Sequence, residues 1–199
     1  MFDFDLRQTL LLLPGILIGL TFHEFAHGWV AYRLGDNTAK HQGRLTLNPI
    51  PHLDPIGFIM LIFFHFGWAK PVPVNPYNLK TDAKQGMLYV SLAGPVTNLL
   101  LAIVLAVLLR LGIFSFMPEV YQMAVWAVYI NIILAVFNLL PVPPLDGSKI
   151  LAGILPGNTP WLHHLESYGI IILLLLLFTG IIGHILGFVI NPIAGLLLP

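Results

Sequence analysis

Long apolar stretches alternate with short polar segments along this chain. Stretches at about 9–32, 86–109, 120–140 and 168–190 each have the length of about 20 residues that crosses a bilayer as a helix. A fifth stretch, about 55–67, has only about a dozen residues, a length more typical of a re-entrant or interfacial element. The pattern therefore predicts about four full transmembrane helices and a re-entrant insert at about 45–78 that contains a short helix.

Composition supports a membrane protein. Hydrophobic residues make up 57% of the 199 residues and charged residues only 9%, whereas a soluble domain carries about 25% charged residues. We therefore expect an all-α integral membrane fold with residues 1–199 forming a single polytopic domain. The net charge is zero, which gives no indication of a nucleic-acid partner, and the absence of cysteine excludes disulfides and thiolate metal ligands.

The basic residues favour the re-entrant interpretation of 55–67. If this stretch crossed the bilayer, four basic residues would lie on one side and five on the other. If it returns to the side it came from, seven share one side and two share the other, and a strong bias of this kind marks the cytoplasmic side. The seven are Arg33, Lys40, Arg44, Lys70, Lys80, Lys84 and Lys149, and the two are Arg7 and Arg110. The N-terminus is then expected outside.

The segment 68–74 of the insert has strand-like residues, with Pro71 and Pro73 at alternate positions. Proline cannot donate to a β-ladder, so alternate prolines suit a strand that has one unpaired edge. We therefore expect β-strand elements in the insert beside its short helix. Such an edge could capture an extended peptide by strand addition.

Three ionisable residues interrupt the first apolar stretch in the sequence "TFHEFAHGW". His23 and His27 are four residues apart, so on a helix they share one face and lie about 6 Å apart, where both can bind one metal ion. Glu24 can reach a water molecule on that ion and act as its general base, as in the H-E-x-x-H pattern. Buried structural histidines would be the alternative, but each ionisable group inside a membrane costs about 2.5 kcal/mol or more unless it is paired or metal-bound.

A candidate for the third ligand lies in "FNLLPVPPLDG", residues 137–147. Its three closely spaced prolines must break the helix that carries Asn138, which leaves Asp146 on irregular backbone, free to turn toward the metal. The alternative is a loop aspartate before a glycine turn. Asp146 reaches the depth of the two histidines only if 55–67 does not cross. One aspartate and a hydroxide would also balance the two positive charges of the ion, which suits a low-dielectric site.

Three motifs together resemble those of the site-2 protease family of intramembrane zinc metalloproteases. They are "HEFAH" in the first predicted span, "AGPVTN" in the next and "NLLPVPPLDG" after the third. In order and spacing they resemble the short form without a PDZ or CBS domain, over roughly residues 15–150. The resemblance implies His23, His27 and Asp146 as ligands of one Zn²⁺ ion and Glu24 as the residue that activates water. We also expect a bacterial or archaeal cell membrane, and the count of basic residues indicates an active site nearer the cytoplasmic side.

The same resemblance implies roles for four further residues. Asn138 and Asn98 would contact the substrate backbone, although Asn98 and Gly94 could equally form a helix-packing pair. His52 and Asp54, in "PHLDP", would gate the site or support it. The insert would help to hold an unwound substrate.

The sequence thus predicts an endopeptidase that cuts within or near the transmembrane segment of a membrane-protein substrate, in regulated intramembrane proteolysis. Its expected partners are that segment and the lipid bilayer. The alternative is a non-catalytic zinc carrier or sensor that uses the same ligands. Glu24 separates the two, because a transport site has no need of a base beside the two histidines.

Overall fold

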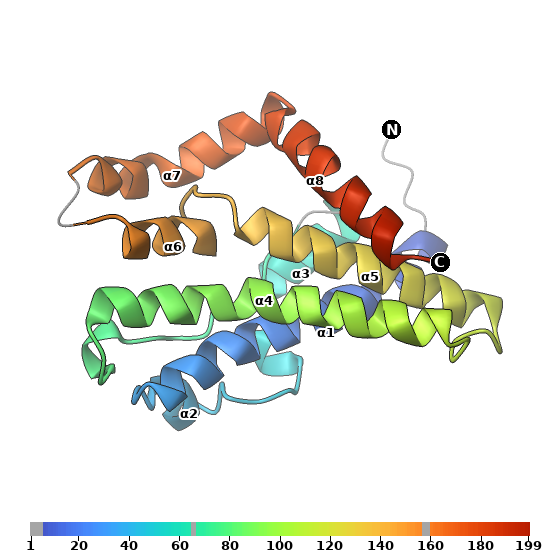
Figure 1. The fold of residues 1–199 in the computed structure, drawn as a ribbon, viewed down its shortest axis with the longest axis horizontal. Helices are drawn as coiled ribbons and strands as arrows, with labels where there is room; N and C mark the ends of the chain where they lie inside the picture. The colour runs from blue at the N-terminus through green and yellow to red at the C-terminus, as the bar shows by residue number, and fades with distance from the viewer. Residues whose placement is uncertain (1–5, 65–66, 157–159) are drawn as a thin grey trace.

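Three long helices form the centre of the computed structural model, which describes residues 6–64, 67–156 and 160–199. They are α1 (Leu6–Arg33), α4 (Ala83–Arg110) and α5 (Pro118–Asn138), and all three are long and apolar enough to cross a membrane. They lie side by side along the length of the molecule (Figure 1). Their bounds differ from the predicted spans by less than one helical turn. The chain is therefore a multi-pass membrane protein.

Shorter helices connect these three or lie at their ends (Figure 1). Between α1 and α4 the chain forms α2 (Thr38–His41), the 3-10 turn η1 (Ile50–His52), α3 (Pro55–Phe64) and the 3-10 turn η2 (Pro76–Asn78). After α5 it forms α6 (Asp146–Ile154), α7 (Pro160–Phe178) and α8 (Ile181–Leu197). With ten residues, α3 is too short to cross a bilayer as a helix.

The central helices pack closely because small residues line their contacts. A Cβ atom added at Gly15 of α1 would lie 2.7 Å from the Ala127 Cα of α5, so only glycine permits this approach. Buried side chains of α4, α5 and α8 form one apolar cluster. Its members are Ala102, Ala106, Leu109, Ala124, Val128, Ile132, Ile190 and Ala194.

The fourth apolar stretch does not form the single full span that its length predicts. Residues 165–178 and 181–197 form two helices bent by 75° at a short break. Gly180, with φ +75°, adopts the left-handed conformation that ends α7. The Thr179 hydroxyl reaches the Leu176 carbonyl at 3.2 Å, one of the last carbonyls of α7. Among the described residues there are thus three straight spans, with a fourth only if the bent pair is counted as one.

The prediction of β-strand elements in the insert was wrong. Among the described residues of the insert there is one isolated antiparallel bridge, between Leu53 and Ala69, and no strand. In the segment after Trp68, side chains take two of the backbone groups that a neighbouring strand would need. The Lys70 carbonyl accepts a hydrogen bond from Arg44 Nη2 at 2.7 Å, and the Val72 N–H donates to Glu24 Oε2 at 2.7 Å.

The buried carboxylate of Asp36 fastens the insert to the end of α1. It accepts hydrogen bonds from Thr38, from the Asn75 N–H at 2.7 Å and from Asn78 Nδ2 at 3.0 Å. Burial alone raises the pKa of Asp36, but these hydrogen bonds outweigh burial and lower the pKa below its usual range. An ionised Asp36 therefore holds the last residues of the insert against the chain that follows α1.

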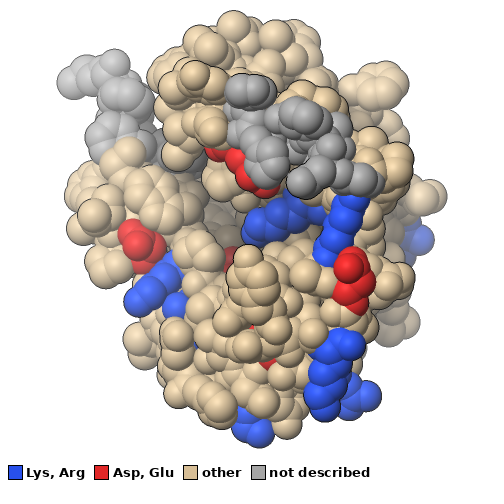
Figure 2. Space-filling model, turned by 90° about the vertical axis from the view of Figure 1, so that its left-hand side faces the viewer, with Lys and Arg blue, Asp and Glu red and all other residues tan. Residues whose placement is uncertain are grey.

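The basic residues separate toward the two ends of the long helices. Arg33 ends α1, Lys84 begins α4 and Lys149 lies in α6, and these parts of the chain meet at the left-hand end of the molecule in Figure 1. Figure 2, which looks onto this end, shows Lys and Arg side chains at several places on it. Arg110, at the other end of α4, lies at the opposite end. The sequence-based prediction that 55–67 does not cross expects Arg110 on the side opposite Arg33, Lys84 and Lys149, and the orientation in the membrane stays a prediction.

Candidate metal centre

The helix α1 brings His23 and His27 together on one face. They are one turn apart, their ring centroids lie 4.5 Å apart and the two rings are nearly perpendicular, at 86°. Both side chains are buried, with 5% and 8% of their surface exposed. Their Nε2 atoms point to a common position, since each lies 3.1 Å from the same carboxylate oxygen, Asp146 Oδ2.

Asp146 reaches this position because the chain leaves helical conformation after α5. The helix ends at Asn138, residues 139–145 form irregular turns, and Asp146 is the first residue of the short helix α6. The irregular backbone that the prolines predict therefore ends just before Asp146, and the aspartate itself begins a helix. The Lys149 ammonium lies 3.8 Å from Asp146 Oδ1, on the side of the carboxylate away from the imidazoles.

Hydrogen bonds on the far side of each imidazole fix its tautomer. His27 Nδ1 lies 2.7 Å from the Val90 carbonyl, which can only accept, so Nδ1 carries the proton and donates. His23 Nδ1 lies 2.6 Å from Asn98 Oδ1 and donates to it in the same way. In the neutral rings both Nε2 atoms then present lone pairs toward Asp146, as ligating histidines do.

This arrangement fits a divalent metal ion. His23, His27 and Asp146 are buried, and their three donor atoms lie within 4.8 Å of one another. Bonds of 2.0–2.1 Å in a tetrahedral site place ligand atoms about 3.3 Å apart, close to the 3.1 Å observed here. Three atoms that only accept protons would repel one another at this distance unless a cation or a proton lay between them.

The helix α4 packs so closely against the two imidazoles that only glycine fits at the point of contact. A Cβ atom at Gly94 of α4 would lie 2.5 Å from both His23 Cε1 and His27 Nε2. The sequence motif that contains Gly94 and Asn98 therefore packs directly against the two imidazoles. Two imidazoles and one carboxylate are a set of three protein ligands typical of catalytic zinc, which binds water in its fourth position.

Glu24 is buried next to His23, and its carboxylate contacts the insert. Oε2 accepts a hydrogen bond from the Val72 N–H at 2.7 Å. Because Pro71 and Pro73 have no N–H, Val72 is the one donor that this three-residue segment offers. The insert thus fixes the direction of the Glu24 carboxylate.

Of the two asparagines predicted to bind the substrate, Asn98 contacts His23 and Asn138 bonds within its own helix. Asn98 is fully buried, and besides its contact with His23 its amide nitrogen donates to the Gly19 carbonyl at 3.0 Å. Asn138 is partly buried at the end of α5, where its amide nitrogen donates to the Leu134 carbonyl at 2.9 Å. The roles of both in substrate binding stay predictions.

His52 and Asp54 bond within the insert. His52 is 1% exposed, its Nε2 lies 2.8 Å from the Thr46 carbonyl, and its own carbonyl accepts from the Lys70 N–H at 2.9 Å. Asp54 accepts from the Gly57 N–H at 2.8 Å, which caps the start of α3. Both residues therefore hold the conformation of the insert, and their role in gating stays a prediction.

One polar residue near the centre is absent from the sequence-based site. Asn131 of α5 is fully buried, and its Oδ1 accepts a hydrogen bond from Asn98 Nδ2 at 2.9 Å. The available signal was a polar side chain inside an apolar span, because such residues are usually bonded to a neighbouring helix. It is weaker than a ligand motif, since a single asparagine has no characteristic spacing.

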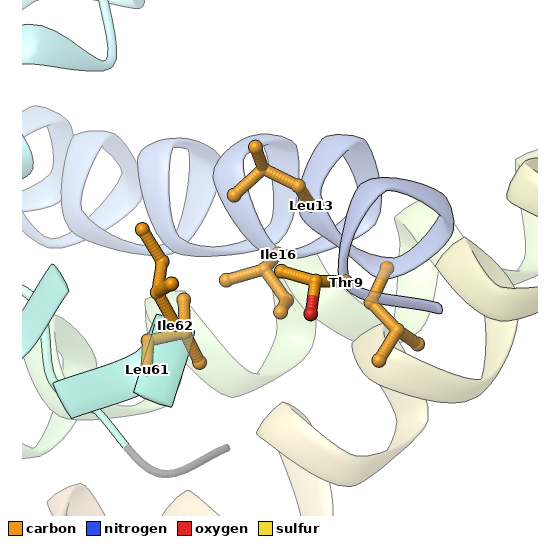
Figure 3. Close-up of a pocket in the computed structure, with 6 residues that line it drawn as sticks. Thr9, Leu13, Ile16, Leu61 and Ile62 are labelled. Atoms are coloured by element: carbon orange, nitrogen blue, oxygen red, sulfur yellow. The ribbon is translucent and has the colours of Figure 1, made fainter. Parts of the chain in front are cut away.

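A small apolar pocket lies apart from the donor atoms, between the first half of α1 and the end of α3 (Figure 3). Thr9, Leu13 and Ile16 of α1 face Leu61 and Ile62 across it. Its volume of about 50 Å³ is too small for a peptide, and its lining offers no metal ligand. It is a packing gap between the two helices.

Comparisons with known proteins show which proteins this chain is similar to. The sequence profile described as Peptidase family M50 matches residues 116–180, which include Asn138 and Asp146. Three similar proteins carry the name "Putative zinc metalloprotease". YwhC of Bacillus subtilis is 44% identical over 86% of this chain and 81% of its own length. Rip2 of Mycolicibacterium smegmatis is 33% identical over 85% and 67%. MJ0611 of Methanocaldococcus jannaschii is 31% identical over 75% and 73%. No solved structure matches the chain.

Proposed function

The chain belongs to peptidase family M50, the site-2 protease family, and from this membership we propose that it is an intramembrane zinc endopeptidase. Its substrate is the transmembrane segment of another membrane protein, which it cleaves within or near the bilayer in regulated intramembrane proteolysis. One observation carries the proposal. The buried donor atoms of His23, His27 and Asp146 meet at one position, and the same helix α1 carries the buried Glu24, among helices long and apolar enough to cross a membrane.

The proposed roles follow from the position of each side chain. His23, His27 and Asp146 hold one Zn²⁺ ion, which when bound polarises the scissile carbonyl and makes water more acidic. Glu24 Oε takes the proton of the attacking water and returns it to the leaving amine. The contact with the Val72 N–H keeps the Glu24 carboxylate from rotating away, so it is oriented before substrate arrives.

The helices around the site also favour this reaction. The donor atoms are buried by α1, α4 and α6, so bulk water reaches them poorly and charges interact strongly there. In this proposal Asn138, at the end of α5, contacts the backbone of a substrate that enters from the membrane. The chain of such a substrate must be unwound first, because a helical peptide bond has its carbonyl already hydrogen-bonded.

The decisive test uses the purified protein in lipid vesicles with a panel of single-span membrane proteins. Glu24→Gln should keep bound zinc but reduce the cleavage rate by about a hundred- to ten-thousand-fold, since general acid–base catalysis contributes this much. Asp146→Ala should lose both zinc and cleavage, and a chelator should abolish wild-type cleavage. A Glu24→Gln variant that still moves zinc across the vesicle membrane, with no cleavage by wild type, would instead indicate a zinc carrier.

We propose the same orientation that the basic residues predict, with the α2 end of the molecule in the cytoplasm of a bacterial or archaeal cell. Because the chain has no cysteine, single cysteines can report this directly. Lys40→Cys and Lys80→Cys should react with an impermeant thiol reagent only from inside, and Ser115→Cys only from outside. Reaction of positions 40 and 80 from opposite sides would contradict both the orientation and the re-entrant insert.

A further inference from the structure

A directed series of hydrogen bonds runs from the backbone of α5 to His23, through two buried asparagines. Asn131 Nδ2 donates to the Ala127 carbonyl at 2.8 Å, and Asn98 Nδ2 donates to Asn131 Oδ1 at 2.9 Å. Asn98 Oδ1 then accepts from His23 Nδ1 at 2.6 Å. Both asparagines are 0% exposed, so water does not replace either side chain as a partner.

The direction of this series is fixed at its start. The Ala127 carbonyl can only accept, so the amide nitrogen of Asn131 faces it and Oδ1 faces Asn98. The amide nitrogen of Asn98 meets two acceptors, Asn131 Oδ1 and the Gly19 carbonyl. If the Asn98 amide turned over, its oxygen would face both acceptors and its nitrogen would face His23.

If the Asn98 amide turned over, the proton of the His23 imidazole would move to the other ring nitrogen. With a donor opposite Nδ1, His23 would have to carry its proton on Nε2, the atom that faces Asp146 and His27. A protonated Nε2 has no lone pair for a metal ion. The orientation of Asn98 therefore decides whether His23 can be a ligand, and Asn131 supplies one of the two acceptors that fix this orientation.

The packing around Asn131 is arranged to permit this contact. A Cβ atom at Gly19 of α1 would lie 3.1 Å from Asn131 Oδ1 and 2.7 Å from Leu134 Cδ1. Glycine at this position lets α5 approach α1, and it also leaves the Gly19 carbonyl open to Asn98. The three central helices thus meet at these asparagines, directly behind the ligand face of His23.

We propose that Asn131 is a positioning residue for the metal centre. Through Asn98, it holds His23 in the tautomer whose Nε2 can bind zinc. This inference rests on the proposed function, because it assumes that His23 is a metal ligand. It assigns Asn131 no contact with the substrate or with the reacting atoms.

The test is the zinc affinity of the full-length protein in detergent, measured by competition with a chromophoric chelator. Asn131→Leu keeps the size of the side chain but removes the acceptor, and we expect about tenfold weaker zinc binding. A tenfold loss is at the lower end of the range for residues that hydrogen-bond to a metal ligand, because the Gly19 carbonyl still holds the Asn98 amide. Asn131→Asp, which keeps an oxygen for Asn98, should bind zinc more tightly than Asn131→Leu. At saturating zinc, the KM of Asn131→Leu for a cleaved substrate should be unchanged.

Ile132→Val is the matched control. Ile132 follows Asn131 in α5, is 0% exposed and packs in the apolar cluster, so this change lowers stability without touching the hydrogen-bond series. Its zinc affinity should equal that of wild type. If Asn131→Leu does not fold, Asn131→Ser replaces it, since a serine hydroxyl reaches the Ala127 carbonyl but not Asn98.

The outcomes separate the two proposals. Zinc affinity of Asn131→Leu equal to that of wild type, or an equal loss in Ile132→Val, would overturn the role of Asn131. Wild-type protein that binds no zinc at all would instead count against the proposed function.

Discussion

Two pairs of glycines with the same spacing have opposite surroundings in this molecule. Gly15 and Gly19 of α1 face α5, where added Cβ atoms would each lie 2.7 Å from the nearest atom. Gly183 and Gly187 of α8 have open space, with nothing closer than 3.9 Å. The G-x-x-x-G pattern alone therefore does not show whether a helix is closely packed.

Polar side chains differ between the two regions in the same way. In the centre, Asn98 bonds to groups of α1 and α5, and His27 to the backbone of α4. In the bent pair, the partners of Thr179 and His184 are carbonyls within one helical turn. Contacts between helices thus fix the side chains of Asn98 and His27, whereas Thr179 at the break and His184 of α8 are satisfied locally. A metal centre needs the first kind of region, because its ligands must stay in place when the ion leaves.

The largest expected difference is between Gly94→Ala and Gly187→Ala. A methyl group at position 94 would lie 2.5 Å from both imidazoles and displace them, so zinc affinity should fall by at least about 100-fold. At position 187 the methyl group has room, and zinc affinity should not change. Chelator competition measures both. Tight zinc binding by Gly94→Ala would show that the donor atoms meet elsewhere.

A smaller difference is expected between Gly15→Ala and Gly183→Ala. The first inserts a methyl group 2.7 Å from the Ala127 backbone and should destabilise the fold by about 1–3 kcal/mol through overpacking. The second should be neutral or stabilise the fold by up to about 1 kcal/mol, because alanine favours a helix more than glycine does. Thermal unfolding in detergent compares the two. Equal effects would mean that α8 is as closely packed as α1.

The smallest expected effect is the pH dependence of the change in Tm caused by Asp36→Asn. Thr179→Val is the control, because it removes no titrating group. The folded pKa of Asp36 is lowered, so its contribution to stability is complete above its unfolded pKa of about 3.9 and is lost as the pH falls through the folded pKa. Asp36→Asn should lower the Tm by a constant amount from about pH 5 to 8, and by less below about pH 4.

Thr179→Val removes a hydrogen bond within one helix and no titrating group, so its effect should be small and independent of pH. A pH-independent effect of Asp36→Asn would contradict the role of an ionised carboxylate at the insert.

The hydrophobic pattern by itself determined the three straight spans and the short α3, because membrane helices must satisfy their backbone within one segment and must have a minimum length. Residue spacing likewise determined that His23 and His27 share one face, since four residues make about one helical turn. The count of basic residues favoured an insert that does not cross, which is the arrangement in which Asp146 meets the histidines. These properties depend on neighbours in sequence or on the bilayer.

The remaining properties depended on contacts between distant segments, which no local pattern encodes. Only the tertiary structure showed that side chains such as Arg44 occupy the backbone groups of the insert, which left no strand at 68–74. It also ended α7 at Gly180 within an unbroken apolar stretch, and joined Asn131 to His23 across three helices. A hydrogen bond needs a donor and an acceptor about 3 Å apart and in line, so it depends on which atoms the packed helices bring together.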